Sequence, residues 1–265
     1  MMIYIVICLL VLYLFLTMSE KEGFSVVHKE EGIQNKVYTN EKIYDNFYTY
    51  IYDDVMLTIP YSMELIQMIR PYLYNNSHTL CIGSRTGHLV QLLSDTTKVT
   101  GLDSSKSMVK MSQYKYPKNE YVSGSYMDSS LFQPNRFSHT ILPLLTVHTI
   151  SNFKELCYIV KEWTVHSGFF FVCFADLRKF PAYQLVNHMP SSYFKSNYQY
   201  SLELNEHKMI ETIQDFNGVK RTNQQDLYEY TESSLIQQAR PAGFVHVKTM
   251  RYESAPLSVC IFQHK

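Results

Sequence analysis

The sequence predicts an α/β fold in which helices cover both faces of a doubly wound, mostly parallel β-sheet. Three observations lead to this prediction. From residue 60 onward, short apolar runs alternate with segments of helical periodicity. A glycine-containing turn at residues 83–87 joins one of these runs to a helix, and the last two apolar runs can form an antiparallel hairpin. The chain has 265 residues, enough for one large domain with appendages.

The N-terminal segment predicts a transmembrane helix. Residues 1–18 carry no charged side chain, and as a helix they would span about 27 Å, close to the roughly 30 Å of a bilayer's hydrocarbon core. A cleavable signal peptide would need a basic start and a small-residue cleavage site, and neither is present. A buried core helix is the other alternative, but the segment lacks a polar face. We expect a single-pass anchor, whose orientation the flanking charges do not indicate.

Residues 19–59 predict a linker followed by a helical arm. Residues 19–40 are polar and mixed in charge, as in a loosely packed linker. Tyr44, Tyr48 and Tyr52 then recur every four residues, which places them on one face of a helix. Two interpretations stay open: this face packs on the main domain, or it covers a bound ligand.

From residue 60 the predicted elements follow in regular order. The predicted strands are short apolar runs at residues 78–82, 99–102, 121–122, 138–142 and 168–176. The predicted helices have an apolar face and occupy residues 61–72, the segment after the glycine turn, residues 104–114 and residues 153–163. Ser104 or Ser105 can cap the third of these helices.

The segment 176–230 is predicted to be an insertion that forms a β-hairpin cap. Two strand-like arms, 198–216 and 219–230, flank Asn217-Gly218, which suits a type I′ turn because both central residues need positive φ. Polar side chains on the arms are expected on a solvated face, with substrate contact as the alternative: His207, Lys208 and Glu211. Thr231 can then cap a helix that runs to Arg240, and residues 246–254 and 257–265 predict the closing antiparallel pair.

Charge and cysteine content restrict the partners and the compartment. Lys plus Arg number 24 and Asp plus Glu number 24, so no basic excess indicates nucleic-acid binding. The five cysteines are odd in number and lack metal-like spacing, which predicts reduced thiols and no metal site. We therefore expect the domain to face a reducing, cytosol-like compartment.

The glycine turn and the strand that follows it predict a ligand site. Glycine permits close backbone approach to a ligand, and the helix start after Gly87 offers free N–H donors. Asp103 ends the next strand, so in a doubly wound sheet it lies at the same edge as the turn. A carboxylate there can accept hydrogen bonds from both hydroxyls of a ribose. The Gly-x-Gly-x-x-Gly spacing of an NAD site is absent.

Taken in order, these segments resemble the class I S-adenosylmethionine-dependent methyltransferases. TLCIGSRTGHL is similar to the family's glycine motif, VTGLDSSKSMVKMS to its ribose-binding motif, YVSGSYMD to the segment beside the adenine, and RFSHTILPLLTVHTI to the fourth-strand region. The resemblance covers about residues 60–265 and implies a seven-stranded sheet with S-adenosylmethionine as cofactor. The cofactor-binding residues that it implies are Gly83, Ser84, Arg85, Gly87, Asp103, Ser104, Met108, Ser125, Tyr126, Met127 and Leu142.

Four positions depart from the family's pattern. Cys81 stands where the family has an acid that orients the methionine part of the cofactor, and Arg85 replaces the middle glycine of the turn. Ser125 replaces the acid near the adenine amine, and Ser138 replaces the Asp of the fourth strand. Each lost charge-assisted hydrogen bond costs about 1.5–3 kcal/mol, so several together can abolish cofactor binding. Arg85 can either meet the cofactor carboxylate or fill the pocket.

Two functions follow as hypotheses. The first is methyl transfer from S-adenosylmethionine to an unidentified acceptor, a small molecule or a protein, near a membrane; the reaction needs alignment more than a fixed catalytic group. His148 is the one catalytic candidate, with a structural role as its alternative. The second is an inactive, membrane-anchored scaffold with assembly partners, such as a virus-encoded component of a virion. A polar pocket beside Asp103 would favour the enzyme, and a pocket filled by Arg85 or the tyrosine face would favour the scaffold.

Overall fold

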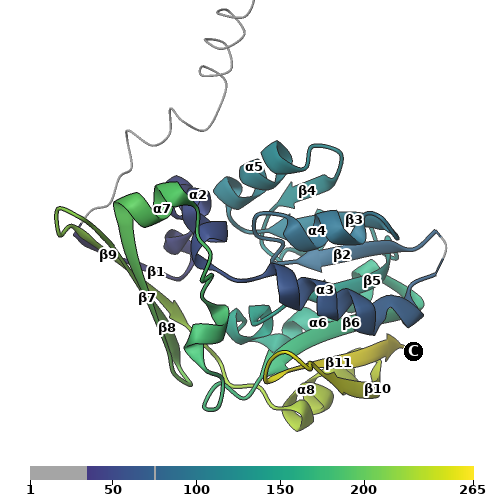
Figure 1. Cartoon of the computed structure of the whole chain (residues 1–265). Helices are drawn as coiled ribbons and strands as arrows, with labels where there is room; N and C mark the ends of the chain where they lie inside the picture. The colour runs from purple at the N-terminus through teal and green to yellow at the C-terminus, as the bar shows by residue number, and fades with distance from the viewer. Residues whose placement is uncertain (1–34, 75) are drawn as a thin grey trace, which may run out of the picture.

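The computed structural model describes residues 35–74 and 76–265 and contains two β-sheets (Figure 1). The predicted anchor, residues 1–18, lies outside the described residues, as does the linker before residue 35. Within the described part of the chain, no helix is both long and apolar enough to cross a bilayer.

The larger sheet has seven strands in the order β10-β11-β6-β5-β2-β3-β4. Its strands are β2 (His78–Ile82), β3 (Lys98–Asp103), β4 (Glu120–Ser123), β5 (Phe137–Leu142), β6 (Thr164–Ala175), β10 (Phe244–Arg251) and β11 (Leu257–His264). The first five are parallel, whereas β11 pairs antiparallel with both β6 and β10. The predicted mostly parallel sheet with a closing hairpin is therefore confirmed.

Helices cover both faces of this sheet. One face carries α3 (Ile59–Ile69), α4 (His88–Leu93) and α5 (Lys106–Lys115), and the other carries α6 (Phe153–Trp163) and α8 (Glu232–Ala239). Successive strand residues point to opposite faces, so neighbours such as Leu80 and Cys81 belong to different core clusters. This double covering explains why the central strands read as continuous apolar runs.

The helix starts agree with the capping residues expected from the sequence. Ser105, not Ser104, caps α5: its Oγ accepts a hydrogen bond from the backbone N of Met108 at 3.1 Å. Thr231 caps α8 in a reciprocal arrangement, in which Thr231 Oγ1 accepts from Ser234 N and Ser234 Oγ accepts from Thr231 N. These caps fix where each helix leaves the edge of the sheet.

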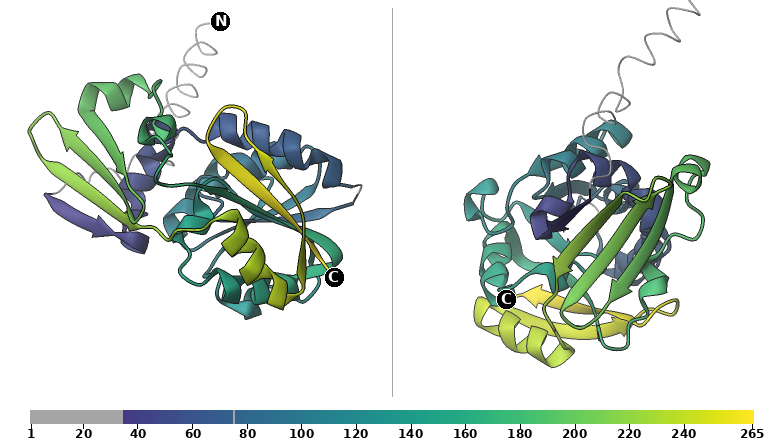
Figure 2. Two further views of the ribbon diagram at one scale, coloured as in Figure 1. Left: turned by 90° about the horizontal axis from the view of Figure 1, so that it is seen from below. Right: turned by 90° about the vertical axis from the view of Figure 1, so that its left-hand side faces the viewer.

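The second sheet stands beside the first and differs from the predicted hairpin (Figure 2). Its four strands, in the order β1-β9-β8-β7, are β1 (Lys36–Thr39), β7 (Tyr198–Leu204), β8 (Lys208–Asp215) and β9 (Lys220–Asp226). The arm predicted over 198–216 is two strands, because Asn205 Oδ1 accepts the N–H groups of His207 and Lys208 and turns the chain. Residues 36–39, expected in a linker, instead pair in parallel with β9. We call this sheet the cap.

The turn at Asn217-Gly218 is not of type I′. A hydrogen bond from Asp215 N to Val219 O closes a loop of three residues, and of these only Gly218 has positive φ, at 83°. A three-residue loop needs one left-handed residue near its end, and glycine supplies it. Asp215 Oδ1 accepts the N–H groups of Asn217 and Val219 and so stabilises the longer turn.

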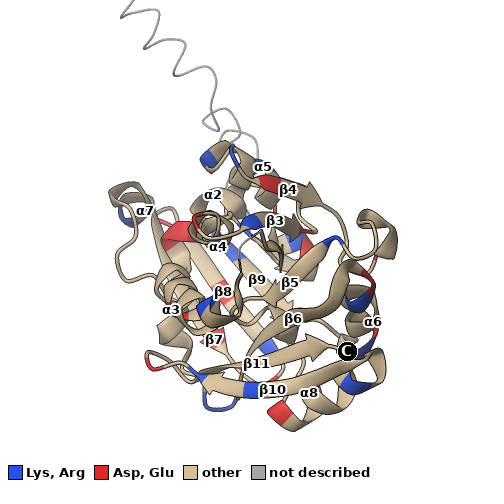
Figure 3. Cartoon of the chain, turned by 90° about the vertical axis from the view of Figure 1, so that its right-hand side faces the viewer, with Lys and Arg blue, Asp and Glu red and all other residues tan. Residues whose placement is uncertain are grey.

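Helix α2 (Asn46–Val55) lies between the cap and the larger domain. Asp45 caps it by accepting a hydrogen bond from Tyr48 N at 2.9 Å. Asn46 accepts a hydrogen bond from Ser107 of α5 at 2.7 Å, and the ring of Phe47 lies 5.7 Å from that of Tyr198 in β7. On the side of the molecule that Figure 3 shows, Lys and Arg residues are interspersed with Asp and Glu residues.

Candidate functional site

Two adjoining cavities lie at the carboxyl edge of the larger sheet, where ligands bind in doubly wound folds. The outer pocket has a volume of 460 Å³ and lies between the ends of β2 and β3 and the cap segments β1, η2 (Asn40–Ile43) and β9. The inner cavity has a volume of 80 Å³ and lies between the glycine turn, η5 (Thr146–Thr149), α2 and α3. The residues common to both linings are Tyr44, Gly83, Arg85, Thr146 and Thr149.

The glycine turn brings these elements close together. Gly83 has φ of 77°, and a Cβ on it would stand 2.8 Å from Thr146 Cγ2. Gly87 has φ of 87°, and a Cβ on it would stand 2.7 Å from the hydroxyl of Tyr121. Gly83 therefore allows the turn to approach η5 beside both cavities. Gly87 packs closely against Tyr121 and does not line either cavity, so its role in cofactor binding stays a prediction.

Asp103 is buried at the end of β3 and faces the outer pocket. Its Oδ2 accepts a hydrogen bond from Arg85 N at 2.9 Å, and its Oδ1 accepts one from Ser105 N at 3.0 Å. An ionised carboxylate has about four acceptor positions, so two bonds leave capacity for a ligand. Asp103 thus holds the turn in place and can also accept hydrogen bonds from a diol.

The other residues implied by the resemblance divide into two groups. Ser84 lines the inner cavity, and Ser104 and Tyr126 line the outer pocket. The remaining four do not line either cavity: Met108, Ser125, Met127 and Leu142. The sequence pattern did not show the direction of these side chains: Met108 and Leu142 are fully buried in the core, and Ser125 Oγ instead accepts a local hydrogen bond from Met127 N at 3.2 Å.

Tyrosines form one wall of the inner cavity. Tyr44 precedes α2, and Tyr48 and Tyr52 follow on it, with ring centroids 5.9 and 5.8 Å apart along the series. All three line the cavity and are packed in the core of the domain, while the covering of a bound ligand by this face stays a prediction. Cys81 lies at the end of β2, and burial raises the pKa of its thiol, which keeps it neutral.

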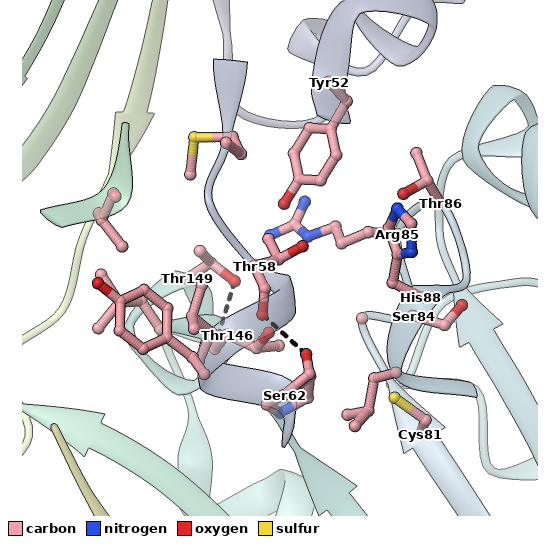
Figure 4. A pocket seen from close by; sticks show the side chains of 18 of the residues that line it. Tyr52, Thr58, Ser62, Cys81, Ser84, Arg85, Thr86, His88, Thr146 and Thr149 are labelled. Carbon is pink, nitrogen blue, oxygen red and sulfur yellow. Dashed lines mark hydrogen bonds between the residues drawn. The ribbon is translucent and has the colours of Figure 1, made fainter. Parts of the chain in front are cut away.

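Arg85 extends from the glycine turn across the inner cavity toward the hydroxyl of Tyr52 (Figure 4). Its guanidinium carbon lies 4.5 Å from the ring centroid of Tyr44, a cation–π contact. Burial lowers the pKa of Arg85, but Tyr44, Tyr52 and Asp103 outweigh burial and the net shift is upward. Arg85 therefore carries a full positive charge between the two cavities.

A cluster around Asp53 fastens α2 to the glycine turn. Asp53 Oδ1 accepts a hydrogen bond from Thr86 Oγ1 at 2.7 Å, while its Oδ2 lies 3.3 Å from His88 Nε2 and pairs with Lys115. Burial raises the pKa of Asp53, but the hydrogen bond from His88 and the charge of Lys115 lower it to about 2. His88 Nδ1 is 2.8 Å from the hydroxyl of Tyr116, so both ring nitrogens of His88 are engaged.

Glu211 was expected on a solvated face, but the structure shows that it is buried. Its Oε1 accepts hydrogen bonds from the hydroxyls of Tyr48 at 2.5 Å and Tyr200 at 2.7 Å. Its Oε2 accepts one from Asn223 Nδ2 at 3.3 Å. Burial raises the pKa of Glu211 despite these bonds. This network joins three strands of the cap to the tyrosine face of α2.

His148 is a structural residue in this geometry. Its Nδ1 donates to the carbonyl of Tyr228 at 2.8 Å, and its Nε2 accepts a hydrogen bond from Ala175 N at 3.1 Å. Burial lowers the pKa of His148 to about 4, so the ring is neutral. Because both nitrogens are occupied and the ring lines neither cavity, the prediction of a catalytic histidine gives way to its structural alternative.

Comparison with known proteins shows the fold that carries this site. No known family model matches the chain, and no curated protein matches it. Among solved structures it is similar to the CcbJ methyltransferase from Streptomyces caelestis, at 16% identity and a TM-score of 0.65 over 83% of this chain and 97% of that one. An S-adenosylmethionine-dependent methyltransferase from Clostridium acetobutylicum matches at 12% identity and a TM-score of 0.59, over 82% and 96%.

A third similar structure was solved with cofactor. It is the S-adenosylmethionine-bound CalS10, an amino pentose methyltransferase from Micromonospora echinaspora, at 11% identity and a TM-score of 0.58 over 85% of this chain and 100% of that one. The chain thus has the fold of the S-adenosylmethionine-dependent methyltransferases over nearly the whole length of these enzymes. At such low identities the similarity shows only the fold, and the function must be inferred from the residues of the site.

Proposed function

We propose that the protein transfers a methyl group from S-adenosylmethionine to an acceptor near a membrane. The observation that carries this proposal is the polar outer pocket beside Asp103, which adjoins a tyrosine-lined inner cavity at the carboxyl edge of the sheet. The membrane part of the proposal is supported by the sequence of residues 1–18, which is apolar and uncharged.

The donor set fits the two halves of this cofactor. The free acceptor positions of Asp103 suit the ribose hydroxyls, and Tyr126 and Gly124 provide a wall for the adenine. The tyrosine rings beside the turn suit the sulfonium, because aromatic faces attract cations. Cys81 supplies no charge for the methionine part, so the adenosine half would provide more of the affinity than in enzymes with an acid there.

The bound cofactor supplies an activated methyl group, and the protein's own residues supply alignment. Holding two reactants in line can provide roughly 7–11 kcal/mol of the barrier reduction. The shared wall of Gly83, Thr146 and Thr149 lies where the outer pocket meets the inner cavity. The acceptor would therefore lie in the inner cavity, covered by α2 and the cap.

The test is calorimetric titration of the full-length chain, in mild detergent, with S-adenosylhomocysteine. We expect micromolar binding, weakened about tenfold to a hundredfold by Asp103→Ala because a buried charge-assisted pair of hydrogen bonds is lost. Asp103→Asn keeps one acceptor oxygen for the two backbone N–H groups that Asp103 holds, so it should bind weakly, and a cooperative thermal transition would show that it still folds. Asp95→Ala, an exposed carboxylate on the far side of α4 from the turn, is the matched control and should bind as the wild type does.

A scaffold is the second candidate, and one observation favours it. Arg85 and Tyr44 stand in contact at the border of the two cavities, so they occupy part of the space that a cofactor would need. An inactive, membrane-anchored protein that binds assembly partners would retain the fold without using the site. Absence of cofactor binding at millimolar concentration, from a chain with a cooperative thermal transition, would establish this alternative.

A further inference from the structure

The guanidinium of Arg85 lacks an anionic partner in the part of the chain that the structure describes. No ion pair among the described residues involves Arg85. The carboxylate of Asp103 accepts hydrogen bonds from backbone N–H groups and not from the guanidinium. The charge of Asp103 acts on Arg85 only from a distance, and a half-buried cation that makes no direct ion pair is stabilised further by a ligand anion at hydrogen-bond distance. Its planar fork of donors matches a carboxylate in particular.

The inner cavity also lacks a group that can remove a proton. His88 is the one histidine among its described lining residues, and both of its nitrogens are engaged by Asp53 and Tyr116. No Asp or Glu belongs to that lining; Glu211 is not part of it and accepts hydrogen bonds from the hydroxyls of Tyr48 and Tyr200. The rest of the described wall carries apolar side chains, the hydroxyls of tyrosines, serines and threonines, and the neutral thiol of Cys81, none of which is a base at neutral pH. An acceptor suited to this cavity has an apolar body and a nucleophile that is already deprotonated.

We propose that the acceptor is a small apolar carboxylic acid, whose carboxylate Arg85 holds in the inner cavity and presents to the methyl group. The inference rests on the proposed methyl transfer and names its substrate class. Arg85 reaches away from the turn toward Tyr52 on the opposite wall, which places the charge on the acceptor side of the cavity (Figure 4). Arg85 is then the specificity-determining residue of the site.

The reaction balances without a base. A carboxylate oxygen forms a bond to the methyl carbon, the sulfur–methyl bond breaks, and its electron pair stays on sulfur. A carboxylate and a sulfonium, with charges of minus one and plus one, become a neutral ester and a neutral thioether. No proton is transferred, and no further reactant is needed. Arg85 loses its anionic partner as the ester forms, which favours product release.

The experiment compares four acceptors of equal length on the full chain with methyl-labelled S-adenosylmethionine: hexanoate, hexan-1-ol, hexylamine and hexanethiol. We expect labelled methyl hexanoate and little transfer to the other three. Butanoate and benzoate, run beside them, report how much length and width the cavity accepts. Methylation of the alcohol, the amine or the thiol at a rate equal to or above that of hexanoate would overturn the inference while leaving the proposed function intact.

Variants of Arg85 separate the acceptor from the cofactor. Arg85→Gln should raise the KM for hexanoate roughly tenfold to a hundredfold. Arg85→Lys should raise the KM less, because lysine keeps the positive charge but lacks the planar guanidinium. S-adenosylhomocysteine, titrated into the same variants, should bind with less than about a threefold change. Arg178→Gln, an exposed arginine at the end of β6, is the matched control.

Two results would count against the assignment in different ways. If Arg85→Gln weakens S-adenosylhomocysteine as strongly as hexanoate, and leaves 5′-methylthioadenosine unaffected, Arg85 serves the cofactor's own carboxylate and the inference is wrong. If the wild-type chain binds neither cofactor form, the proposed function fails and the inference fails with it.

Discussion

Single residues hold the two cavities open through hydrogen bonds that cross long stretches of sequence. Asp53 lies on α2 yet bonds Thr86 in the glycine turn and pairs with Lys115 on α5. Asp103 bonds the backbone of the same turn from β3. The turn is thus fixed from both sides by carboxylates, which allows Arg85 to adopt its positive φ of 52°.

The depressed pKa of Asp53 predicts a pH-dependent stability. Its folded pKa of about 2 lies below the ordinary 3.8, so its contribution is fully present above pH 4 and is lost as the pH falls toward 2. Asp53→Asn should therefore lower the free energy of unfolding by about 2 kcal/mol at neutral pH. The difference from wild type should shrink on acidification, as urea unfolding at pH 7, 4 and 2.5 would measure. Asp95→Asn is the control, and an equal loss in it at pH 7 would contradict the assignment.

Among single residues, the sequence predicted those whose position follows from the strand directly before them. Gly83 and Asp103 follow directly from strands whose ends share one edge, and both lie at the outer pocket. Glu211 and Asp53 could not be predicted in the same way. Their partners are far away along the chain, such as Tyr48, which is 163 positions from Glu211. Pattern reasoning also could not tell that Met108 and Leu142 point into the core.

Among the elements, the start of α2 and the segment before it connect the cap to the domain. Arg221 of β9 is fully buried, and its guanidinium bonds Asp45 at 2.6 Å and the carbonyl of Ile43 at 2.7 Å. The same group lies 3.8 Å from the ring centroid of Tyr38 in β1. The side chain of Arg221 therefore links strands β9 and β1 of the cap to the start of α2. The sequence showed the tyrosine face of α2 but not β1, because a four-residue strand in a charged segment has no clear alternation.

Removing Arg221 should loosen the cap before the larger sheet. Arg221→Met leaves Asp45 and the carbonyl of Ile43 without their partner; a fully buried pair would lose about 3–5 kcal/mol, and the partly exposed Asp45 makes the loss smaller. We expect amide hydrogen exchange to accelerate in residues 36–55 and 208–226, with little change in β6 and β11. Arg251→Met, at an exposed position on β10, gives the matched comparison. Uniform acceleration across both sheets would mean that the cap and the domain unfold as one unit.

At the scale of the whole molecule, the seven-stranded sheet was predictable and the cap was not. Strands and helices alternate locally, and each boundary has its own capping or turn residue, such as Ser105 and Thr231. The cap instead depends on pairing of β1 with β9, about 185 residues later in the sequence. Such a pairing leaves no local signal, because no short turn joins the two strands and their contacts form only in the folded chain.

The sequence of the N-terminal segment predicts that the protein is bound to a membrane, and this prediction can be measured. Residues 1–18 are uncharged and apolar, so the full chain should sediment with membranes and resist extraction at high pH. Replacing Leu10 and Leu12 by Lys should release it, because each charge at the centre of a spanning helix costs about 2.5–3.5 kcal/mol. Ser19→Lys with Glu20→Lys adds two lysines just outside the segment and should leave the chain in the membrane fraction. An apolar acid partitions into bilayers, so an anchored enzyme would meet its acceptor at the membrane surface. Full extraction of the wild-type chain at high pH would contradict the predicted anchor and this route to the acceptor.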